Sequence, residues 1–502
     1  MTREKVFITL SIILILVTFL LSFDNLCRYR YDTYMAAYDN ATHLANMRGF
    51  YKQGIFSSEN YWLYAPSVFP LNYPPLFHII GAILFSFFSP GFISCFYFWS
   101  IYLMVLLTVF FMAKKITDSA GAFFTVLGMI CLYELADKSF GFSPLVLSVV
   151  FGLWALITVR QRPLWGWAFL ALAILTHLNG ILFLLGYGAY AVYDRSHRQE
   201  VGAALGRGPH RRVRIVGVIT ILSVTALIAG FIILQRAELV HSLIPADQVI
   251  PILLRPVTIF FGPFDIRRIL FAALGWAGFI MLLRKKDYLS VISLGAIVIG
   301  SLIIGGTIRT LNMMIVQGLL IGVVFFSFFL KLNSIHKHTV LNSLIVSLGV
   351  CGMVAFPSSR DPYRSVLSEI TFVNFCLPSV SIYTGSHFPH LNDFKEAARL
   401  MTNMGKKDDL VYVAGVADNQ RNLIFAFSGI VPLAVDRKMY PSISGATALF
   451  TERFLSNSLP LFWFGPPPPY GYELLKTFPE GLSLFVLARK EKARTLSFKV
   501  LR

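Results

Sequence analysis

Repeated apolar runs of near twenty residues constrain the fold of this chain more than any other feature. The first run is VFITLSIILILVTFLLSF at residues 6–23. An α-helix rises about 1.5 Å per residue, so about twenty apolar residues cross the hydrocarbon core of a bilayer. This run lies where a signal peptide would lie, but no small-x-small cleavage site follows it. We therefore expect an uncleaved first helix in a polytopic membrane protein.

The charge of the chain supports a membrane topology rather than a nucleic-acid partner. The formal net charge is +18, and only 14% of the residues are charged. Most of the excess lies in short loops between the apolar runs, where Lys and Arg set the orientation of the spans. MTREK at the start predicts a cytoplasmic N-terminus. The longest basic stretch, at 194–214, is interpreted as a topology signal in contact with lipid headgroups.

The alternation of apolar runs and basic loops predicts about eleven spans. Because this number is odd and the N-terminus is inside, the C-terminal tail is expected outside the cytoplasm. The expected spans are 6–23, 92–113, 119–133, 144–159, a hairpin of two short helices at 165–193 that turns near THLNG, 215–234, 269–283, 289–306, 310–330 and 339–356.

Three segments are expected outside the membrane or at its surface. Residues 24–75 form the first outer loop, and 76–89 is an apolar segment too short to span, which we expect to lie in the interface. The chain is thus predicted to comprise a transmembrane domain at 1–357 and an extracytoplasmic α/β domain at 358–502.

The tail has the pattern of a small α/β domain. LNDFKEAARLMTNMG (391–405) has helical spacing of apolar residues, while DLVYVAGV (409–416) and SLFVLARK (483–490) are typical of strands. GPPPPYGY (465–472) predicts a stiff loop. No GxGxxG or Walker sequence occurs in this tail, so we expect no nucleotide cofactor.

The sequence gives no indication of a metal centre. The five cysteines are scattered without a CxxC pair, so they imply neither a disulfide framework nor a zinc site. The outer loops show no cluster of acids with ligand spacing. We therefore expect no metal ion.

A polar stretch in the first outer loop is the strongest functional signal. In YDNATHLANMRGF, helical spacing puts Asp39, His43 and Asn46 on one stripe, with Met47 and Phe50 next to it. One interpretation is structural: an amphipathic helix lies on the membrane, Asp39 caps it and His43 anchors it among headgroups. The other interpretation is a catalytic acid held at the outer membrane surface.

A second element, NYPPLFH at 72–78, favours the catalytic interpretation. Two prolines fix the chain and begin the next helix. An acid-bearing stripe followed by this element resembles the GT-C fold membrane glycosyltransferases. The closest likeness is the bacterial branch similar to protein mannosyltransferases and lipid A aminoarabinose transferases. In this resemblance Asp39 takes the position of the family's first acid, and Tyr73-Pro74-Pro75-Leu76 takes that of its second element.

The resemblance extends along the chain. LAILTHLNGILFLLGY (172–187) is similar to a family segment that carries a lysine, which is His177 here. TIRTLNMMIVQGLLIG (307–322) resembles the segment with the family's outer-face arginine, which corresponds to Arg309. The soluble outer tail also fits the family's layout.

The chain departs from the family at three acidic or basic positions. The family's second acid, usually Glu, is Asn40 here. An acid near the start of the fourth span is replaced by Ser143-Pro144, and Glu134 or Asp137 in the same outer loop would have to substitute for it. With His177 in place of the lysine, these changes put the set of groups that contact phosphate in doubt.

The resemblance implies a sugar donor linked to a lipid phosphate, such as a polyprenyl-phosphate hexose, and a glycan, lipid or protein acceptor. Displacement at the anomeric carbon needs a base for the acceptor hydroxyl and cations for the departing phosphate. Asp39 is the candidate base, because loss of solvation at the edge of an apolar cavity would raise its pKa. Arg309 is the candidate phosphate clamp; its structural alternative is an arginine that snorkels to the interface.

Other residues are weaker candidates for substrate binding. His177 and Arg255 would contact phosphate, while His43 and His78 would bond to the sugar or to Asp39. Each histidine has the alternative of a satisfied interfacial side chain. The aromatic loop 59–73, which ends at Tyr73, would line the cavity, although Tyr and Trp gather at any membrane interface.

Two further function classes remain open from the sequence. A transporter or flippase for lipid-linked glycans would show polar residues at mid-membrane and related halves, and few acids lie inside the spans. A polysaccharide polymerase or ligase would have a long outer loop without the early acid. Of the three classes, we favour a transferase. We expect it to act at the outer face of the cytoplasmic (inner) membrane, with its C-terminal domain periplasmic or extracellular.

Overall fold

The computed structural model describes sixteen stretches of the chain, and several predicted features lie outside them. The described residues are 2–28, 40–54, 59–60, 69–70, 74–131, 143–159, 161–188, 266–304, 306–355, 391–404, 410–414, 418–429, 431–434, 461–464, 472–479 and 483–487. Asp39, Tyr73, Glu134, Asp137, Arg255 and the predicted span at 215–234 fall outside these stretches.

The described chain is mostly helical, and its long helices coincide with the predicted spans. Each predicted apolar run that the structure describes is a helix with ends within a few residues of those expected. These helices are α1 (Arg3–Arg28), α6 (Pro90–Ile116), α7 (Ser119–Cys131), α9 (Pro144–Thr158), α10 (Pro163–Thr176), α15 (Ile266–Arg284), α16 (Tyr288–Ile304), α17 (Gly306–His336) and α18 (Thr339–Ala355).

A test of length and hydropathy supports the membrane assignment in part. Among residues whose side chains are described, Gly318–His336 is long and apolar enough to cross a bilayer, and five further helices are apolar but shorter. The total number of spans stays a prediction.

The chain packs as two compact units. The first comprises residues 1–25 and 98–382, and the second comprises 26–97 and 383–502. This grouping differs from the predicted domains at 1–357 and 358–502, because the first outer loop packs with the C-terminal elements. The two units group residues that pack together. The predicted boundary at residue 357 instead marks the point where the sequence changes from apolar to polar. The grouping therefore does not test the predicted boundary.

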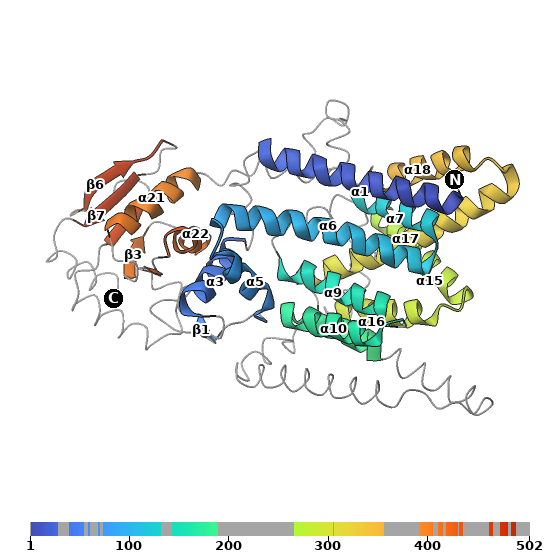
Figure 1. Ribbon diagram of the computed structural model, residues 1–502, viewed down its shortest axis with the longest axis horizontal. Helices are drawn as coiled ribbons and strands as arrows, with labels where there is room; N and C mark the ends of the chain where they lie inside the picture. Colours follow the sequence, from blue (N-terminus) through green and yellow to red (C-terminus); the bar gives the residue numbers. More distant parts are fainter. Residues whose placement is uncertain are drawn as a thin grey trace. The chain divides into compact units, whose positions relative to one another are not determined.

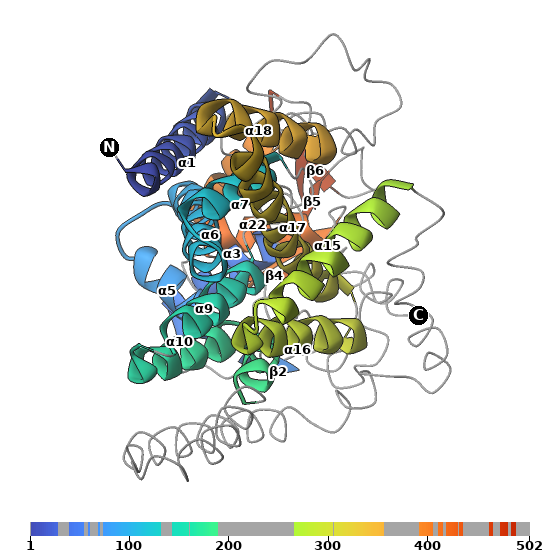
Figure 2. The same ribbon diagram turned by 90° about the vertical axis from the view of Figure 1, so that its right-hand side faces the viewer.

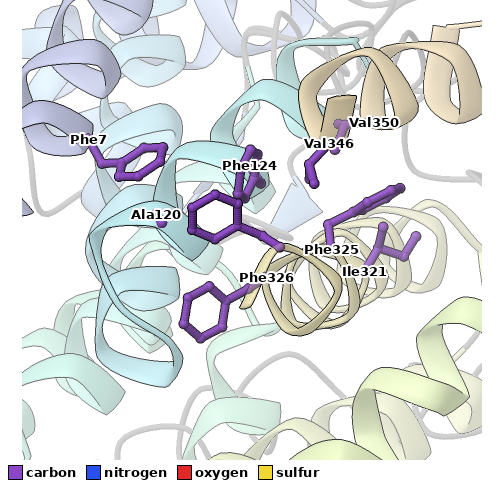
Figure 3. Close-up of a cluster of buried hydrophobic side chains, with 9 residues drawn as sticks. Phe7, Ala120, Phe124, Ile321, Phe325, Phe326, Val346 and Val350 are labelled. Carbon is purple, nitrogen blue, oxygen red and sulfur yellow. The ribbon is translucent and has the colours of Figure 1, made fainter. Parts of the chain in front are cut away.

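The first unit has an aromatic core between α1, α7, α17 and α18. Figure 2 shows the ribbons of these helices, and Figure 3 shows the buried side chains between them. Phe7 of α1 lies against Phe329 of α17 with ring centroids 5.5 Å apart, and both side chains are buried. Phe124 of α7 completes this contact at 5.4 Å from Phe329. Val346 and Val350 bring α18 into the same cluster. Burial of three phenylalanine rings at one crossing holds the N-terminal helix to helices more than a hundred residues away.

The predicted hairpin at 165–193 is confirmed over its described part. α10 ends at Thr176, and a helical stretch resumes at 180–188 after a short turn. The rings of Trp167 and Tyr187 meet with centroids 4.3 Å apart, which requires the two arms to run side by side. The hydroxyl of Ser148 in α9 donates a hydrogen bond to the carbonyl of Ala173 in α10 at 2.8 Å. These two helices lie next to each other in Figure 1.

Charged contacts gather at one end of the first unit's helices. Arg3 pairs with Asp118 at 3.1 Å, and Lys114 pairs with Glu4 at 3.3 Å. Lys115 donates to the last carbonyls of α9, at 2.7 Å to Leu156 and 2.9 Å to Ile157. The N-terminal residues therefore lie with the basic last turn of α6, as expected if both face the same side of a membrane.

The second unit combines the first outer loop with the C-terminal helices and strands. It contains α3 (Asn40–Gln53), α5 (Leu76–Leu84), α21 (Leu391–Met404), α22 (Asp418–Ser428) and seven short strands. The strands are β1 (Glu59–Asn60), β2 (Phe69–Pro70), β3 (Leu410–Ala414), β4 (Val431–Ala434), β5 (Leu461–Phe464), β6 (Tyr472–Thr477) and β7 (Ser483–Leu487).

The C-terminal strands form one mixed sheet in the order β4-β3-β5-β7-β6. β3 pairs in parallel with β4 and β5, whereas β7 pairs antiparallel with β5 and β6. The predicted helix at 391–405 and the predicted strands at 409–416 and 483–490 are present as α21, β3 and β7. That these elements form a separate domain outside the membrane stays a prediction.

One interpretation of the first outer loop differs from the structure in part. An amphipathic helix anchored among headgroups by His43 is one alternative from the sequence, but nine of the fourteen residues of α3, His43 and Asn46 among them, are buried within the protein. α5 and α22 pack against α3, so the stripe of His43 and Asn46 faces other protein groups, whereas residues 51–53 at the end of the helix are exposed.

Candidate active site

Two histidines from α3 and α5 meet in the interior of the second unit. Nδ1 of His43 lies 3.0 Å from Nε2 of His78, and both residues are at most 3% exposed. α3 brings His43 inward one turn after its first residue, and α5 brings His78 inward at its third residue. One ring donates its N–H and the other accepts through a lone pair, so at least one ring is neutral.

Aromatic rings surround this histidine pair. Phe50 stacks on His78 with centroids 6.3 Å apart, and Phe77 stands edge-on to His43 at 5.6 Å. Tyr97, near the start of α6, donates its hydroxyl to the carbonyl of Phe77 at 3.0 Å. This packing fixes the start of α5, which the prolines at 74 and 75 begin as the sequence predicted.

Burial determines the charge of His78. Loss of solvation lowers the pKa of His78 from 6.5 to about 3. The imidazole is therefore neutral at neutral pH. A neutral histidine in this position can donate or accept a hydrogen bond, but it does not provide a cation for phosphate.

Helix α22 covers α3 from the C-terminal part of the chain. Phe425 of α22 is buried in one cluster with Ala45, Phe50 and Ala82. Asn422 donates to the hydroxyl of Thr42 at 3.0 Å. The contact links residues almost four hundred positions apart in sequence and encloses the helix that carries the polar stripe.

Asp39 lies just before the described part of α3. The helix begins at Asn40, and Asn40, His43 and Asn46 are all buried. In the sequence, Asp39 precedes His43 by four residues. Asn40, which stands where the family usually has a second acid, has its side chain in the interior.

His177 lies in the first unit, at the end of α10. The backbone N–H of Asn179 donates to Nδ1 of His177 at 3.0 Å. This bond needs a lone pair on Nδ1, so the ring is neutral with its proton on Nε2. His177 can donate a hydrogen bond, but in this arrangement it does not supply the charge of the lysine that it replaces.

The backbone of α17 places Arg309 in the first turn of that helix, three residues after Gly306. The N-terminus of a helix favours anions through its free N–H groups and its dipole. The remaining candidates, Tyr73, Glu134, Asp137 and Arg255, lie outside the described residues. Within the described stretches, no group of three or more His, Cys, Asp or Glu side chains could hold a metal ion.

Sequence reasoning missed α22 as a cover of α3 and Arg48 as a half-buried cation on that helix. The apolar spacing of Leu423, Ile424 and Phe425 could have indicated a buried helix, but not its partner. The arginine carried no signal beyond its position in the polar stretch.

Comparison with solved structures identifies the fold of this chain. Neither protein families nor curated proteins give a match to the sequence. Among solved structures, ArnT from Cupriavidus metallidurans in the apo state matches with a TM-score of 0.56 and 12% identity, over 97% of this chain and 98% of that one. The same protein bound to undecaprenyl phosphate matches with a TM-score of 0.51 and 13% identity, over 96% and 97% of the two chains.

An oligosaccharyltransferase from Archaeoglobus fulgidus, in complex with Zn and sulfate, also matches, with a TM-score of 0.53 and 12% identity. The alignment covers 90% of this chain but 67% of the oligosaccharyltransferase. At this level of identity the likeness concerns the fold. The fold expected from the acid-bearing stripe and the proline element is confirmed: the chain has the GT-C fold of polytopic membrane glycosyltransferases.

Proposed function

We propose that this protein is an integral membrane glycosyltransferase that moves a sugar from a polyprenyl-phosphate donor to an acceptor hydroxyl at the outer face of the cytoplasmic membrane. The observation that carries the proposal is the likeness to ArnT over 97% of this chain and 98% of that one. One of the two matched ArnT structures is bound to undecaprenyl phosphate, which supports a polyprenyl-phosphate donor here.

In this proposal Asp39 is the general base. It takes the proton of the acceptor hydroxyl while that oxygen attacks the anomeric carbon, and the lipid phosphate leaves. The burial of α3 supports the assignment, because a carboxyl at the edge of an apolar interior has a higher pKa than one in water.

Arg309 is proposed to hold the departing phosphate. Its place in the first turn of α17 adds the helix dipole to its own charge. A guanidinium also makes two parallel hydrogen bonds to phosphate, which suits a leaving group that gains charge in the transition state. No divalent metal is proposed for this step.

The neutral histidines are proposed to orient groups rather than to carry charge. His43 lies one turn after Asp39, so it is suited to hold the base or a sugar hydroxyl. His78 then fixes the ring of His43 through the hydrogen bond of 3.0 Å. His177 is proposed to donate from Nε2 to a polar group of the donor.

The likeness to an oligosaccharyltransferase supports a second candidate, transfer of a whole oligosaccharide. Another matched structure of that enzyme is tethered to an acceptor peptide, so a protein acceptor is included. A third of the oligosaccharyltransferase has no counterpart here, whereas ArnT is matched almost completely. Transfer of a single sugar is therefore the first candidate.

The test is transfer of label from radiolabelled polyprenyl-phosphate sugars to a membrane extract by the purified protein. Asp39→Asn should lower turnover by about 10²–10⁴-fold, since an amide keeps the shape but cannot accept the proton. Asn caps a helix as well as Asp does, so a purely capping role predicts almost no loss. Asp24→Asn, near the end of α1, and Asp32→Asn, between α1 and α3 in the sequence, are the controls. Movement of the labelled lipid without covalent transfer would instead support a flippase.

A further inference from the structure

Arg48 is a half-buried cation at the end of α3 that faces aromatic rings. Its guanidinium carbon lies 5.3 Å from the ring centre of Tyr51 and 5.4 Å from that of Phe85, which follows α5. Its Nε atom is buried and has no hydrogen-bond partner among the described residues. Burial lowers the pKa of Arg48, but an arginine remains charged at neutral pH.

Two of the other stacked cations in the described chain have an anionic partner. Arg3 lies 5.7 Å above the ring of Phe329 and also pairs with Asp118 at 3.1 Å. Lys476 lies above Phe478 and pairs with Glu396. Within the described residues, no carboxylate pairs with Arg48. A partly dehydrated guanidinium without a counter-charge is unfavourable, and an anion bound there would offset that cost.

Lys52 adds a second positive charge one turn further along α3. It donates to the carbonyl of Gly429, directly after α22. Gly429 has φ of 70°, and a Cβ at this position would lie 2.7 Å from Cε of Lys52 and 3.1 Å from Nη2 of Arg48. The side chains of Lys52 and Arg48 therefore both lie against Gly429.

The two cations lie on a different side of α3 from His43. Arg48 follows His43 by five residues, which is about 140° around the helix and about 7.5 Å along it. A phosphate bound beside His43 would therefore contact a different face of α3 from one bound at Arg48. The pair is suited to a second anion, at a different place from the departing phosphate.

An exposed apolar surface lies next to these cations. Ile83 on the outer face of α5 is 53% exposed, and Phe87 and Phe88, two and three residues after Phe85, are 75% and 43% exposed. Positive charge beside apolar side chains fits an amphiphile whose phosphate meets the cations while its chains meet the apolar surface.

We propose that Arg48, with Lys52 beside it, binds the phosphate of a membrane lipid at a site separate from the one that holds the donor's departing phosphate. The guanidinium makes two parallel hydrogen bonds to the phosphate, and the lysine adds charge. The ligand is an anionic phospholipid of the bilayer, whose phosphate lies at the membrane surface beside its apolar chains. This site does not depend on the transfer reaction.

The experiment measures binding by calorimetry to the full-length protein in phosphatidylcholine nanodiscs, without any sugar donor. The probes are dihexanoyl phosphatidic acid, dihexanoyl phosphatidylcholine and inorganic phosphate. We expect phosphatidic acid to bind more tightly than the other two. Arg48→Gln should weaken this binding by about ten- to a hundredfold, the usual effect of losing a charge-assisted hydrogen bond, and Arg48→Lys should restore part of it.

Arg3→Gln is the matched control, because Arg3 also stacks on a phenylalanine but already has a carboxylate partner. We expect its affinity for phosphatidic acid to equal that of the wild type. Equal weakening by Arg3→Gln, or wild-type affinity in Arg48→Gln, would overturn the site. Equal affinity for inorganic phosphate and phosphatidic acid would overturn the lipid part of the proposal. If Arg48→Gln lowers thermal stability, the Arg48→Lys variant decides. An affinity for phosphatidic acid below that of the wild type supports the site, and an unchanged affinity overturns it.

Discussion

Acid should destabilise this protein through His78 in particular. The ring is completely buried, and its pKa in the folded protein is about 3, compared with 6.5 in water. Between these values the unfolded chain binds a proton that the folded chain does not. Stability is therefore fully present above about pH 6.5 and is lost as the pH falls.

The size of this loss follows from the pKa shift. At pH 5 the pH lies 1.5 units below the unfolded pKa, and each unit corresponds to about 1.4 kcal/mol. The folded ring stays neutral at pH 5. Lowering the pH from 7 to 5 should therefore cost about 2 kcal/mol of unfolding free energy through His78 alone. Because the ring is buried, solvent screening does not reduce this contribution much.

The assay is denaturant unfolding of the detergent-solubilised protein at pH 7 and pH 5. His78→Gln places an amide nitrogen or oxygen near the position of Nε2, so it keeps a bond to His43 without a titrating ring. This variant should lose about 2 kcal/mol less than the wild type between the two pH values. His336→Gln, at an exposed histidine at the end of α17, is the matched control. A wild-type pH dependence in His78→Gln would refute the argument.

The remaining predictions concern the proposed clamp, packing and topology. Arg309→Ala should weaken donor use strongly and Arg309→Lys should restore only part of it, measured as kcat/KM, and equal values in all three proteins would remove Arg309 from the site. Phe425→Ala should lower the unfolding free energy by about 3–5 kcal/mol, because the side chain is 1% exposed. Phe427→Ala, at a half-buried position on the same helix, is the matched control. Gly278→Ala should cost about 1–3 kcal/mol in the same assay, because its Cβ would lie 2.2 Å from the Leu320 carbonyl oxygen. A reporter that is active only outside the cytoplasm, fused after Arg502, should be active, and activity of a cytoplasmic reporter there would mean a wrong span count.

The helices were predictable from the sequence because their signals are local. A run of apolar residues bounded by charge, as at the ends of α6 and α15, specifies a long helix without knowledge of its neighbours. The start of α5 was also local, since Pro74 and Pro75 exclude the preceding chain from a helix. Segments of the C-terminal part with clear apolar spacing, such as α21, were found for the same reason.

The environment of the candidate site was not predictable, because it depends on contacts between distant parts of the chain. The sequence showed that His43 and Asn46 share a stripe, but not that α22 covers α3. A polar helix with mostly buried residues contradicts the usual pattern of a surface helix. Its burial depends on partners almost four hundred residues away, such as Asn422, and no local spacing encodes them.

A continuous series of contacts connects the C-terminal part of the chain to the polar stripe. Phe425 packs in one buried cluster with Phe50, the ring of Phe50 stacks on His78 at 6.3 Å, and His78 is bonded to His43 at 3.0 Å. Each contact restricts the next, because a close-packed interior leaves little room for a ring to turn. Helix α3 is therefore held from a part of the sequence that carries none of the proposed reacting groups. This arrangement contributes to the burial of the polar stripe. α22 supplies apolar surface on one side of α3, and His43 and His78 are hydrogen-bonded to each other on the side toward α5.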